Sequence, residues 1–325
     1  MTIIASQELT IAALLDVPEA DRDLEWVAPS LSLALSLEMA TLPPYLAMLW
    51  SISDEGPAKS MIWSILEDEM CHMGLVCNMI SSLGFKPPVI ASVPKYDGPL
   101  PGGVSPKLIV HLAPLSKSYL KDVAMEIEMP EKPLAEATGF PTIGKFYEAL
   151  REALERIRPV FKGERQLTSS IGSGVTPIRN LAEAVAAIER IATEGEGTTS
   201  SGCADPGCTR LAHYYAFGSI YHGKTFEKKD GKWGYTGAPV PFPAVRPVAR
   251  IPSGGWSGDV PQKVRDFRVV YRQMLQDLEE AWAIGSKEKL SAAIRAMRGM
   301  TSIAEAIMTI RVPGQDKVYG PDFLI

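Results

Sequence analysis

The chain has 325 residues, more than a minimal helical bundle needs, so one enlarged domain is expected, with two domains as the alternative. Its hydrophobic content of 46% and charged content of 22% are ordinary for a globular protein with a large core and exclude a disordered chain. The net charge of −5, without a basic tract, gives no electrostatic footprint for nucleic acid or an anionic membrane. We therefore expect a small molecule as the partner.

The first predicted helix runs from Leu24 to about Ile52 and contains a membrane-like stretch, residues 27–53. Glu38 is the only charged residue in that stretch. Its length would allow a membrane span, but the Pro43-Pro44 pair and the absence of a Lys/Arg cluster at either end argue against one. We predict a buried core helix that is kinked at the proline pair.

The second predicted helix runs from about Ala58 to Leu83. Its apolar positions recur on one helical face, and Glu69 and His72 lie on that same face. Glu67 and Asp68 are rotated off it, and we predict that both are solvated.

The rest of the chain alternates loops with helical patterns. Residues 85–113 are rich in proline and glycine and are expected to be an ordered excursion packed on the helices. The other expected elements are helices at about 115–128, 142–158, 178–193 and 207–225, a loop or short hairpin at 228–259, and helices at about 260–284 and 286–310. We predict a single domain over 1–325, with a bundle core at about 24–84 and 142–225 and a helical extension at about 260–310.

Four cysteines are too few and too scattered for a disulfide framework. The start of the chain, MTIIASQELT, has no basic segment followed by an apolar one, so we expect a reduced, cytoplasmic setting. Cys203 and Cys208, in SGCADPGCTR, are close enough for a local disulfide or a thiol pair. The favoured interpretation is two unpaired loop cysteines, because zinc would need companion ligands that are not nearby.

Glu38 carries the main chemical inference. An ionised carboxylate within an apolar helix costs several kcal/mol unless something compensates it. The pair Glu69 and His72, in a Glu-x-x-His arrangement, places a carboxylate and an imidazole side by side, and a metal cation would satisfy all three groups. This is the ligand pattern of four-helix-bundle metal proteins, in which one helix gives a Glu and the next a Glu-x-x-His. The alternative is a relict site or a polar network in the core.

Several segments resemble those of one known group. They are LSLEMATLPPYLAMLWSI, LEDEMCHMGLVCNMISSLGFKP, IEMPE, TIGKFYEAL, IERIATEGEG, LAHYYAFGSIYHGK and YGPDFLI. In this order, covering most of the chain, they resemble the ferritin-like proteins related to iminophenylpyruvate dimer synthase, found in violacein- and rebeccamycin-type pathways that couple aromatic amino-acid-derived imines. The resemblance implies an all-α, ferritin-like four-helix bundle with long Pro/Gly-rich insertions and extra C-terminal helices.

The resemblance also implies where the second half of a metal site lies. It points to the segments TIGKFY, EGEG and HYYAF. The predicted metal ligands are therefore Glu38, Glu69, His72, Glu196 and His213.

The chain departs from the family pattern at three positions. Lys145 stands where relatives are expected to carry a Glu, and Glu148, one turn further on, is either its substitute or a surface partner of Lys145. Arg210 and Ser219 occupy positions where a Glu would complete a second Glu-x-x-His pair. One ion or an asymmetric pair is therefore an alternative to two, and His222 is a second-tier candidate for a substrate contact or a ligand.

Carboxylate and imidazole ligands without a thiolate suit iron, with manganese or another divalent metal as alternatives. We predict a metal-dependent oxidoreductase of secondary metabolism, with one or two iron ions, acting on a small organic molecule such as an amino-acid-derived imine. A bundle whose degenerate metal site serves a structural or partner-binding role is the second hypothesis. The residues do not determine the catalytic groups, and they leave a homo-oligomer open.

Overall fold

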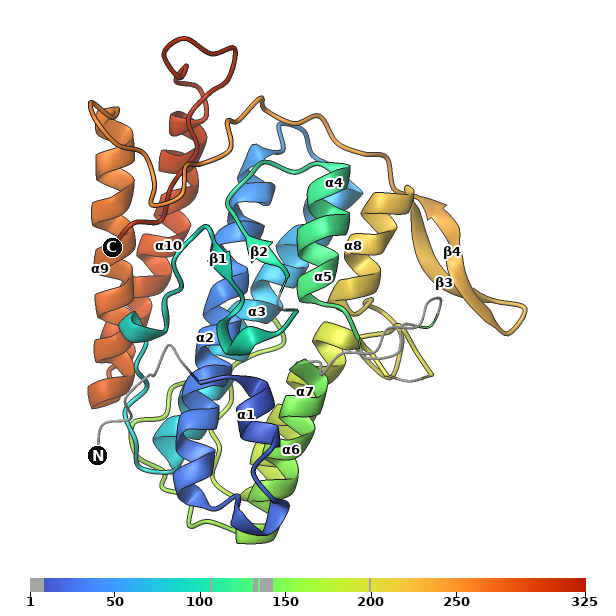
Figure 1. Cartoon of the computed structure of the whole chain (residues 1–325), viewed down its shortest axis with the longest axis vertical. Coiled ribbons are helices and arrows are strands. Elements are labelled where there is room, and N and C mark those ends of the chain that lie inside the picture. The colour runs from blue at the N-terminus through green and yellow to red at the C-terminus, as the bar shows by residue number, and fades with distance from the viewer. Residues whose placement is uncertain (1–8, 106, 131–133, 135–142, 199) are drawn as a thin grey trace.

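A long helix pair runs through the middle of the molecule (Figure 1). The computed structural model describes residues 9–105, 107–130, 134, 143–198 and 200–325. The pair consists of α2 (Leu24–Ser51) and α3 (Pro57–Ser82). The Asp23 carboxylate caps α2 by accepting from the N–H groups of Glu25 and Trp26, and Pro57 occupies the first position of α3. Both helices begin and end within a few residues of their predicted bounds.

Shorter helices lie around this pair. They are α1 (Ile11–Leu15), α4 (Lys117–Tyr119), the π-helical turn η4 (Leu120–Ala124), α5 (Met125–Ile127), α6 (Ile143–Ile157), α7 (Leu181–Glu196) and α8 (His213–His222). Helix α6 packs on α7, α5 packs on α8, and α3 contacts both α7 and α8. In Figure 1, α5 and α8 lie above α6 and α7, so the ends of shorter helices meet beside the long pair. The expected helix from 142 begins at a residue outside the described part of the chain.

Helix α2 continues through Pro43 and Pro44 as one helix. Pro44 has no N–H to donate to the Ala40 carbonyl, and the Tyr96 hydroxyl donates to that oxygen instead, over 2.8 Å. Helix α2 is long and apolar enough to span a membrane, but 89% of its most apolar 18-residue stretch is buried inside the protein. It is a core helix, as its sequence predicts.

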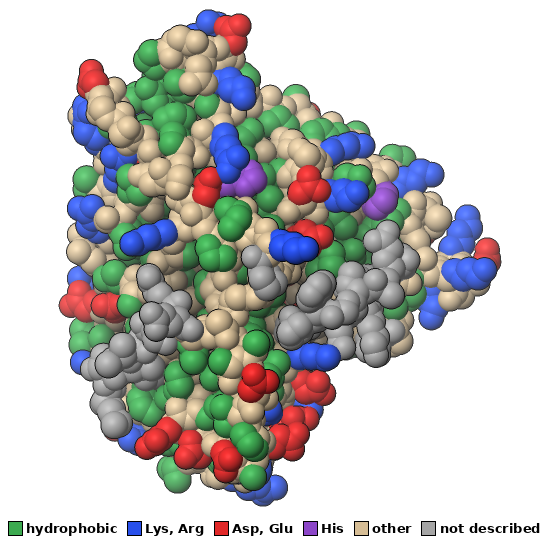
Figure 2. Space-filling view, in the orientation of Figure 1, with side chains coloured by type: hydrophobic (Ala, Val, Ile, Leu, Met, Phe, Trp, Pro, Cys, Tyr) green, Lys and Arg blue, Asp and Glu red, His purple; other side chains and the backbone are tan. Residues whose placement is uncertain are grey.

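The C-terminal helices α9 (Gln262–Ile284) and α10 (Lys287–Ile307) form a hairpin that packs on α2 and α3. Gly285 ends α9 with φ 72°, a conformation that glycine adopts without steric cost. Short elements lie outside the helices: η1 (Glu19–Asp21), η2 (Ile90–Ser92), η3 (Pro101–Gly103), and the antiparallel pairs β1 (Gly98–Pro99) with β2 (Ile109–Val110) and β3 (Lys224–Lys229) with β4 (Lys232–Pro239). The β3–β4 hairpin projects from the bundle, with exposed lysines near its turn (Figure 2).

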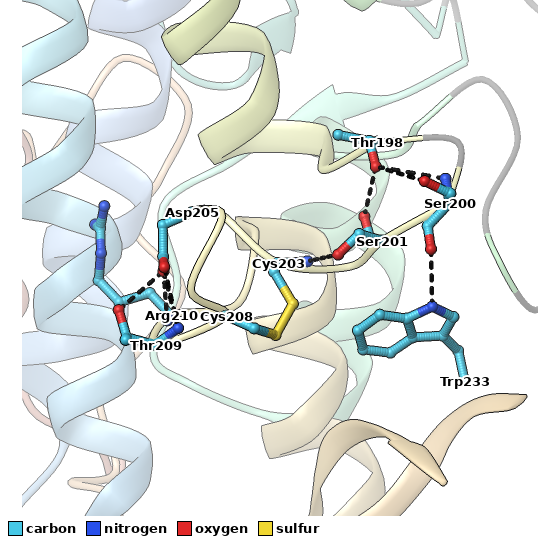
Figure 3. The surroundings of a disulfide bond; sticks show 9 residues. All are labelled: Thr198, Ser200, Ser201, Cys203, Asp205, Cys208, Thr209, Arg210 and Trp233. Atoms are coloured by element: carbon cyan, nitrogen blue, oxygen red, sulfur yellow. Dashed lines mark hydrogen bonds between the residues drawn. A yellow bond between two sulfur atoms is a disulfide. The ribbon is translucent and has the colours of Figure 1, made fainter. Parts of the chain in front are cut away.

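The predicted helix at 207–225 is only partly present. Helix α8 covers its middle, while residues 200–212 form a loop and β3 begins at Lys224. Cys203 and Cys208 are joined by a disulfide in that loop, so the interpretation as unpaired cysteines is wrong (Figure 3). The intervening turn at Pro206 and Gly207 brings the two Cα atoms to 5.0 Å, within the range that a disulfide spans.

Candidate metal centre

Five buried side chains meet beside the long helix pair. Glu38 comes from α2, Glu69 and His72 from α3, Glu128 from the end of α5, and His213 from the first position of α8. They form two groups, Glu38/Glu69/His72 and Glu69/Glu128/His213, and within each group one candidate ligand atom per residue lies within 4.8 Å of the others. Glu69 belongs to both groups.

The two histidines point into the centre in the same way. His72 Nδ1 lies 3.5 Å from Glu38 Oε2 and 3.7 Å from Glu69 Oε1. His213 Nδ1 lies 2.8 Å from the same Glu69 oxygen and 3.6 Å from Glu128 Oε2. The rings are stacked, with centroids 5.7 Å apart and an interplanar angle of 27°. Each half of the site therefore consists of one imidazole nitrogen, one glutamate of its own and the shared Glu69.

A hydroxyl group holds one oxygen of each glutamate. The hydrogen bonds run from Tyr147 to Glu38 Oε1, from Thr41 to Glu69 Oε2 over 2.7 Å, and from Tyr45 to Glu128 Oε1 over 2.5 Å. The other oxygen of each glutamate is the one that faces a histidine Nδ1. The three carboxylates are thus oriented by their surroundings, with one free oxygen each toward the centre.

The buried atoms of this site fit a cation. Neither ring nitrogen of His213 has a hydrogen-bond partner among the described residues, although Glu69 Oε1 is 2.8 Å from Nδ1. A buried polar atom without a partner costs about 1–3 kcal/mol. A metal ion at this point would accept the Nδ1 lone pair and neutralise the surrounding carboxylates. Oxygen and imidazole ligands without a thiolate suit iron or manganese.

Burial and mutual charge shift the pKa values of these groups. Burial, aided by the charge on Glu69, raises the pKa of Glu38 and of Glu128. Burial also opposes ionisation of Glu69, but its contacts with His213 and His72 outweigh burial and hold its pKa well below the usual range. For both histidines, burial disfavours the imidazolium form, yet the surrounding carboxylates raise the pKa well above its ordinary value. The two histidines, Glu38 and Glu128 therefore retain protons more strongly than free side chains do.

A second layer of charged groups faces the Nε2 atoms of the two histidines, on the side away from the three glutamates. His72 Nε2 lies 2.7 Å from Glu194 Oε2, and His213 Nε2 lies 3.7 Å from Asp68 Oδ2. Arg210 joins the two carboxylates, because Nη1 donates to Asp68 and Nη2 donates to Glu194 over 3.0 Å. The contact with His72 lowers the pKa of Glu194 to about 2 against the effect of its burial. Carboxylates in this place fix the ring orientation of ligating histidines.

The prediction that Asp68 is solvated is wrong, since it is only 3% exposed. Its position off the apolar face of α3 is as the sequence indicates, but Arg210 and helix α8 cover that side of α3. Glu67, its neighbour, is half-buried.

A family model described as ferritin-like matches residues 31–222, which include all five side chains of the two groups. The chain belongs to the ferritin-like family. A crystal structure of a ferritin-like protein from Caulobacter vibrioides is similar, with a TM-score of 0.63 and 20% sequence identity, over 92% of this chain and 97% of that one. No curated protein matches the chain. The predicted all-α, ferritin-like fold is confirmed, and α9 and α10 lie outside the residues that the family model matches.

The ferritin-like fold brings four of the five predicted ligands together: Glu38, Glu69, His72 and His213. The fifth, Glu196, is at the end of α7 and lines a small cavity of about 40 Å³ that Glu38, Glu69 and His72 also line. Its Oε1 accepts a hydrogen bond from the Gly144 N–H over 2.8 Å, and it belongs to neither ligand group among the described residues. Its assignment as a ligand stays a prediction.

Glu128 was not among the predicted ligands. It belongs to the IEMPE segment, one of those that carry the family resemblance, and it directly follows the short helix α5. Unlike Glu38, it stands near other charged residues in the sequence, Glu126 and Glu131, so no local pattern marks it as a ligand. In the structure it is 7% exposed.

The departures from the family pattern do not lie among the ligand groups. Lys145 and Glu148 are exposed on α6, whereas Tyr147 is on the buried face of that helix and reaches Glu38. Arg210 belongs to the second layer of charges. Glu128 is the carboxylate that joins Glu69 and His213 in the second group.

Two residues at the far end of α8 have other roles. The Ser219 hydroxyl donates to the Tyr215 carbonyl and accepts from the Phe226 N–H, so it ties α8 to β3. His222 is exposed and stacks on Tyr235, with ring centroids 4.1 Å apart. It is nine positions along α8 from His213, which places it about 13 Å further along the helix axis.

Proposed function

We propose that this ferritin-like protein binds two divalent transition-metal ions, iron or manganese, one in each ligand group, with Glu69 shared between them. The observation that carries the proposal is the repeated arrangement: each half has its own glutamate and its own histidine Nδ1, and both include one oxygen of Glu69. Divalent cations would take the place of protons as the counter-charge of the three buried carboxylates.

We further propose that the metal-loaded protein is an oxidoreductase acting on a small organic molecule. Bound iron would supply one-electron chemistry with O₂ or peroxide as the oxidant. The chain itself orients the carboxylates through Tyr45, Thr41 and Tyr147 and excludes bulk water by burying every ligand. The resemblance to relatives of iminophenylpyruvate dimer synthase favours an amino-acid-derived imine as the substrate.

We propose that the oxidant reaches the metal ions through the cavity beside the ligands. Its volume of about 40 Å³ suits a molecule the size of dioxygen or water. Its apolar wall includes Ile127, Ile143 and Ile191, and its polar wall includes Glu38, Glu69 and His72. An oxidant in this cavity would lie next to ligand atoms of both halves.

The first experiment measures metal content. The purified chain is incubated with Fe(II) without oxygen, or with Mn(II) in air, desalted, and analysed by inductively coupled plasma mass spectrometry. We expect two ions per chain, one for each ligand group. A chain that retains neither metal after loading would support the second hypothesis, a degenerate bundle with a structural or partner-binding role.

The second experiment tests the reaction class. Iron-loaded protein is mixed in air with imines formed from aromatic amino acids and their oxo acids, while oxygen uptake and products are followed by electrode and mass spectrometry. We expect substrate-dependent oxygen uptake that the Glu69→Ala variant lacks. Oxygen uptake that accompanies Fe(II) oxidation alone, with every imine unchanged, would contradict the oxidoreductase proposal and favour iron storage.

A further inference from the structure

Within the loop between α7 and α8, the Cys203–Cys208 disulfide closes a covalent ring of residues 203–208 (Figure 3). Inside this ring, the Asp205 carboxylate accepts hydrogen bonds from the N–H and hydroxyl of Thr209 and from the N–H of Arg210, the last over 2.8 Å. The Ala204 N–H donates to the Arg210 carbonyl over 2.9 Å. Both sides of the Arg210 backbone are therefore bonded to residues enclosed by the disulfide.

Arg210 is also the residue that joins the second layer of the metal centre. Its guanidinium donates to Asp68 and Glu194, the carboxylates that face His213 and His72. Glu194 has a further cationic neighbour, Arg190, at 3.4 Å. Asp68 has no other lysine or arginine partner in the described part of the chain, and its Oδ1 already lacks a hydrogen bond.

We propose that Arg210 is a positioning residue for both histidines and that the Cys203–Cys208 disulfide keeps it in place, so that opening the disulfide weakens metal binding. This proposal rests on the proposed metal-binding function. Arg210 acts on His72 through Glu194, which lies within hydrogen-bond distance of Nε2, and on His213 through the charge of Asp68, whose Oδ2 lies 3.7 Å from Nε2. A guanidinium suits the role because its fork of N–H groups can bond two carboxylates at once.

The backbone conformation of Cys208 leads us to expect that the loop changes structure when the disulfide is reduced. Cys208 has φ 51°, a left-handed conformation that non-glycine residues rarely adopt. The covalent ring and the hydrogen bond from the Cys208 N–H to the Asp205 carbonyl, over 3.0 Å, hold it there. Once the ring is open, Cys208 is free to return to an extended or right-handed conformation, and the hydrogen bonds that place Arg210 lose their covalent support.

The bond is accessible from one side. Cys208 is exposed and Cys203 is 5% exposed, whereas Cys71 and Cys77 are fully buried. A dithiol reductant attacks Cys208 Sγ, the sulfur–sulfur bond breaks, and Cys203 leaves as a thiolate and takes a proton. The second thiol of the reductant then releases Cys208. Two electrons and two protons pass from the dithiol, which becomes a disulfide, to the two protein cysteines.

The test measures the dissociation constant of Mn(II) by electron paramagnetic resonance of the free ion. The samples are the oxidised chain, the chain reduced with dithiothreitol and desalted without oxygen, the Cys203→Ser/Cys208→Ser variant, and Arg210→Gln. Arg179→Gln is the control, since Arg179 is an exposed residue just before α7 that pairs only with Glu183 in the described structure. We expect the reduced chain, the double-serine variant and Arg210→Gln each to bind Mn(II) about tenfold more weakly than the oxidised chain, and the control to match it.

A combined variant separates the proposed route from a general loss of stability. If the disulfide acts through Arg210, adding Arg210→Gln to the double-serine variant produces little further loss, because the two changes remove the same restraint. Additive losses, or a reduced chain that binds Mn(II) as tightly as the oxidised one, would overturn the proposal. If the double-serine variant does not fold, as judged by circular dichroism, the reduced and reoxidised wild-type chain supplies the same comparison. Failure of the oxidised chain itself to bind Mn(II) would instead refute the proposed function.

Discussion

Oε1 of Glu69 lies 2.8 Å from Nδ1 of His213, and this contact joins α3 to α8 at the centre of the ferritin-like bundle. The same oxygen lies 3.7 Å from Nδ1 of His72. Glu69 is therefore the side chain common to both halves of the site, whereas Glu38 and Glu128 each serve one half. This asymmetry of roles among three buried glutamates leads to the first prediction.

Replacing Glu69 by alanine should abolish binding of both metal ions, while Glu38→Ala and Glu128→Ala should each leave about one ion per chain. The reason is that only Glu69 contributes to both ligand groups. Metal content after loading with Mn(II) and desalting measures the outcome, and Glu148→Ala, an exposed glutamate on α6, is the control. Equal stoichiometry in the three ligand variants would mean that Glu69 is not shared.

Metal affinity should increase with pH. In the metal-free protein the carboxylates that surround His72 and His213 raise the pKa of both imidazoles, and burial raises the pKa of Glu38 and Glu128. The raised pKa values make these groups retain protons more strongly than free side chains do, and a metal ion competes with those protons, so binding weakens as the pH falls. Calorimetric titration with Mn(II) in buffers of different ionisation enthalpy should show about one or more protons released per ion. An affinity that is constant from about pH 6 to about pH 8 would contradict this assignment.

Removing the hydroxyl of Tyr147 should weaken one metal site. Tyr147→Phe keeps the ring but leaves Oε1 of Glu38 without its donor, so the carboxylate is free to rotate. The expected loss in Mn(II) affinity is about tenfold at one of the two sites, as for other groups that orient a metal ligand. Tyr221→Phe, at the far end of α8, provides a matched control. Two sites weakened equally would show that Tyr147 supports the whole bundle rather than Glu38.

Asn78 should be among the most sensitive core positions for stability. Its side chain is fully buried, donates to the carbonyls of Leu167 and Thr176 over 2.8 Å each, and accepts from the Leu167 N–H and Trp282 Nε1. It thereby ties α3 to the 167–176 segment and to α9. Asn78→Ala leaves four polar groups without partners and should lower the free energy of unfolding by about 3–4 kcal/mol.

Chemical denaturation of the metal-free protein measures this effect. Asn180→Ala removes the helix-capping side chain of α7 and should cost only about 1 kcal/mol, which makes it a suitable comparison. A cost below about 1 kcal/mol for Asn78→Ala would show that water replaces its hydrogen bonds.

The sequence by itself determined the features that depend on neighbours along the chain. The two long helices, the burial of Glu38, and the shared face of Glu69 and His72 follow from helical periodicity, since residues three or four apart lie on one side of a helix. The need for a partner at Glu38 follows from the cost of a buried charge. His213 was predicted as a ligand only because its segment resembles that of a known family.

The tertiary structure decided which distant residues complete the centre. Glu128, Asp68 and Arg210 have no local pattern that assigns them to it, because their roles depend on how α5, α8 and the 200–212 loop pack against α3. The pairing of Cys203 with Cys208 is local by contrast, since the turn between them brings the two Cα atoms to 5.0 Å. Helical periodicity specifies which face of a helix is buried, but the groups that meet that face come from segments whose approach only the packed chain defines.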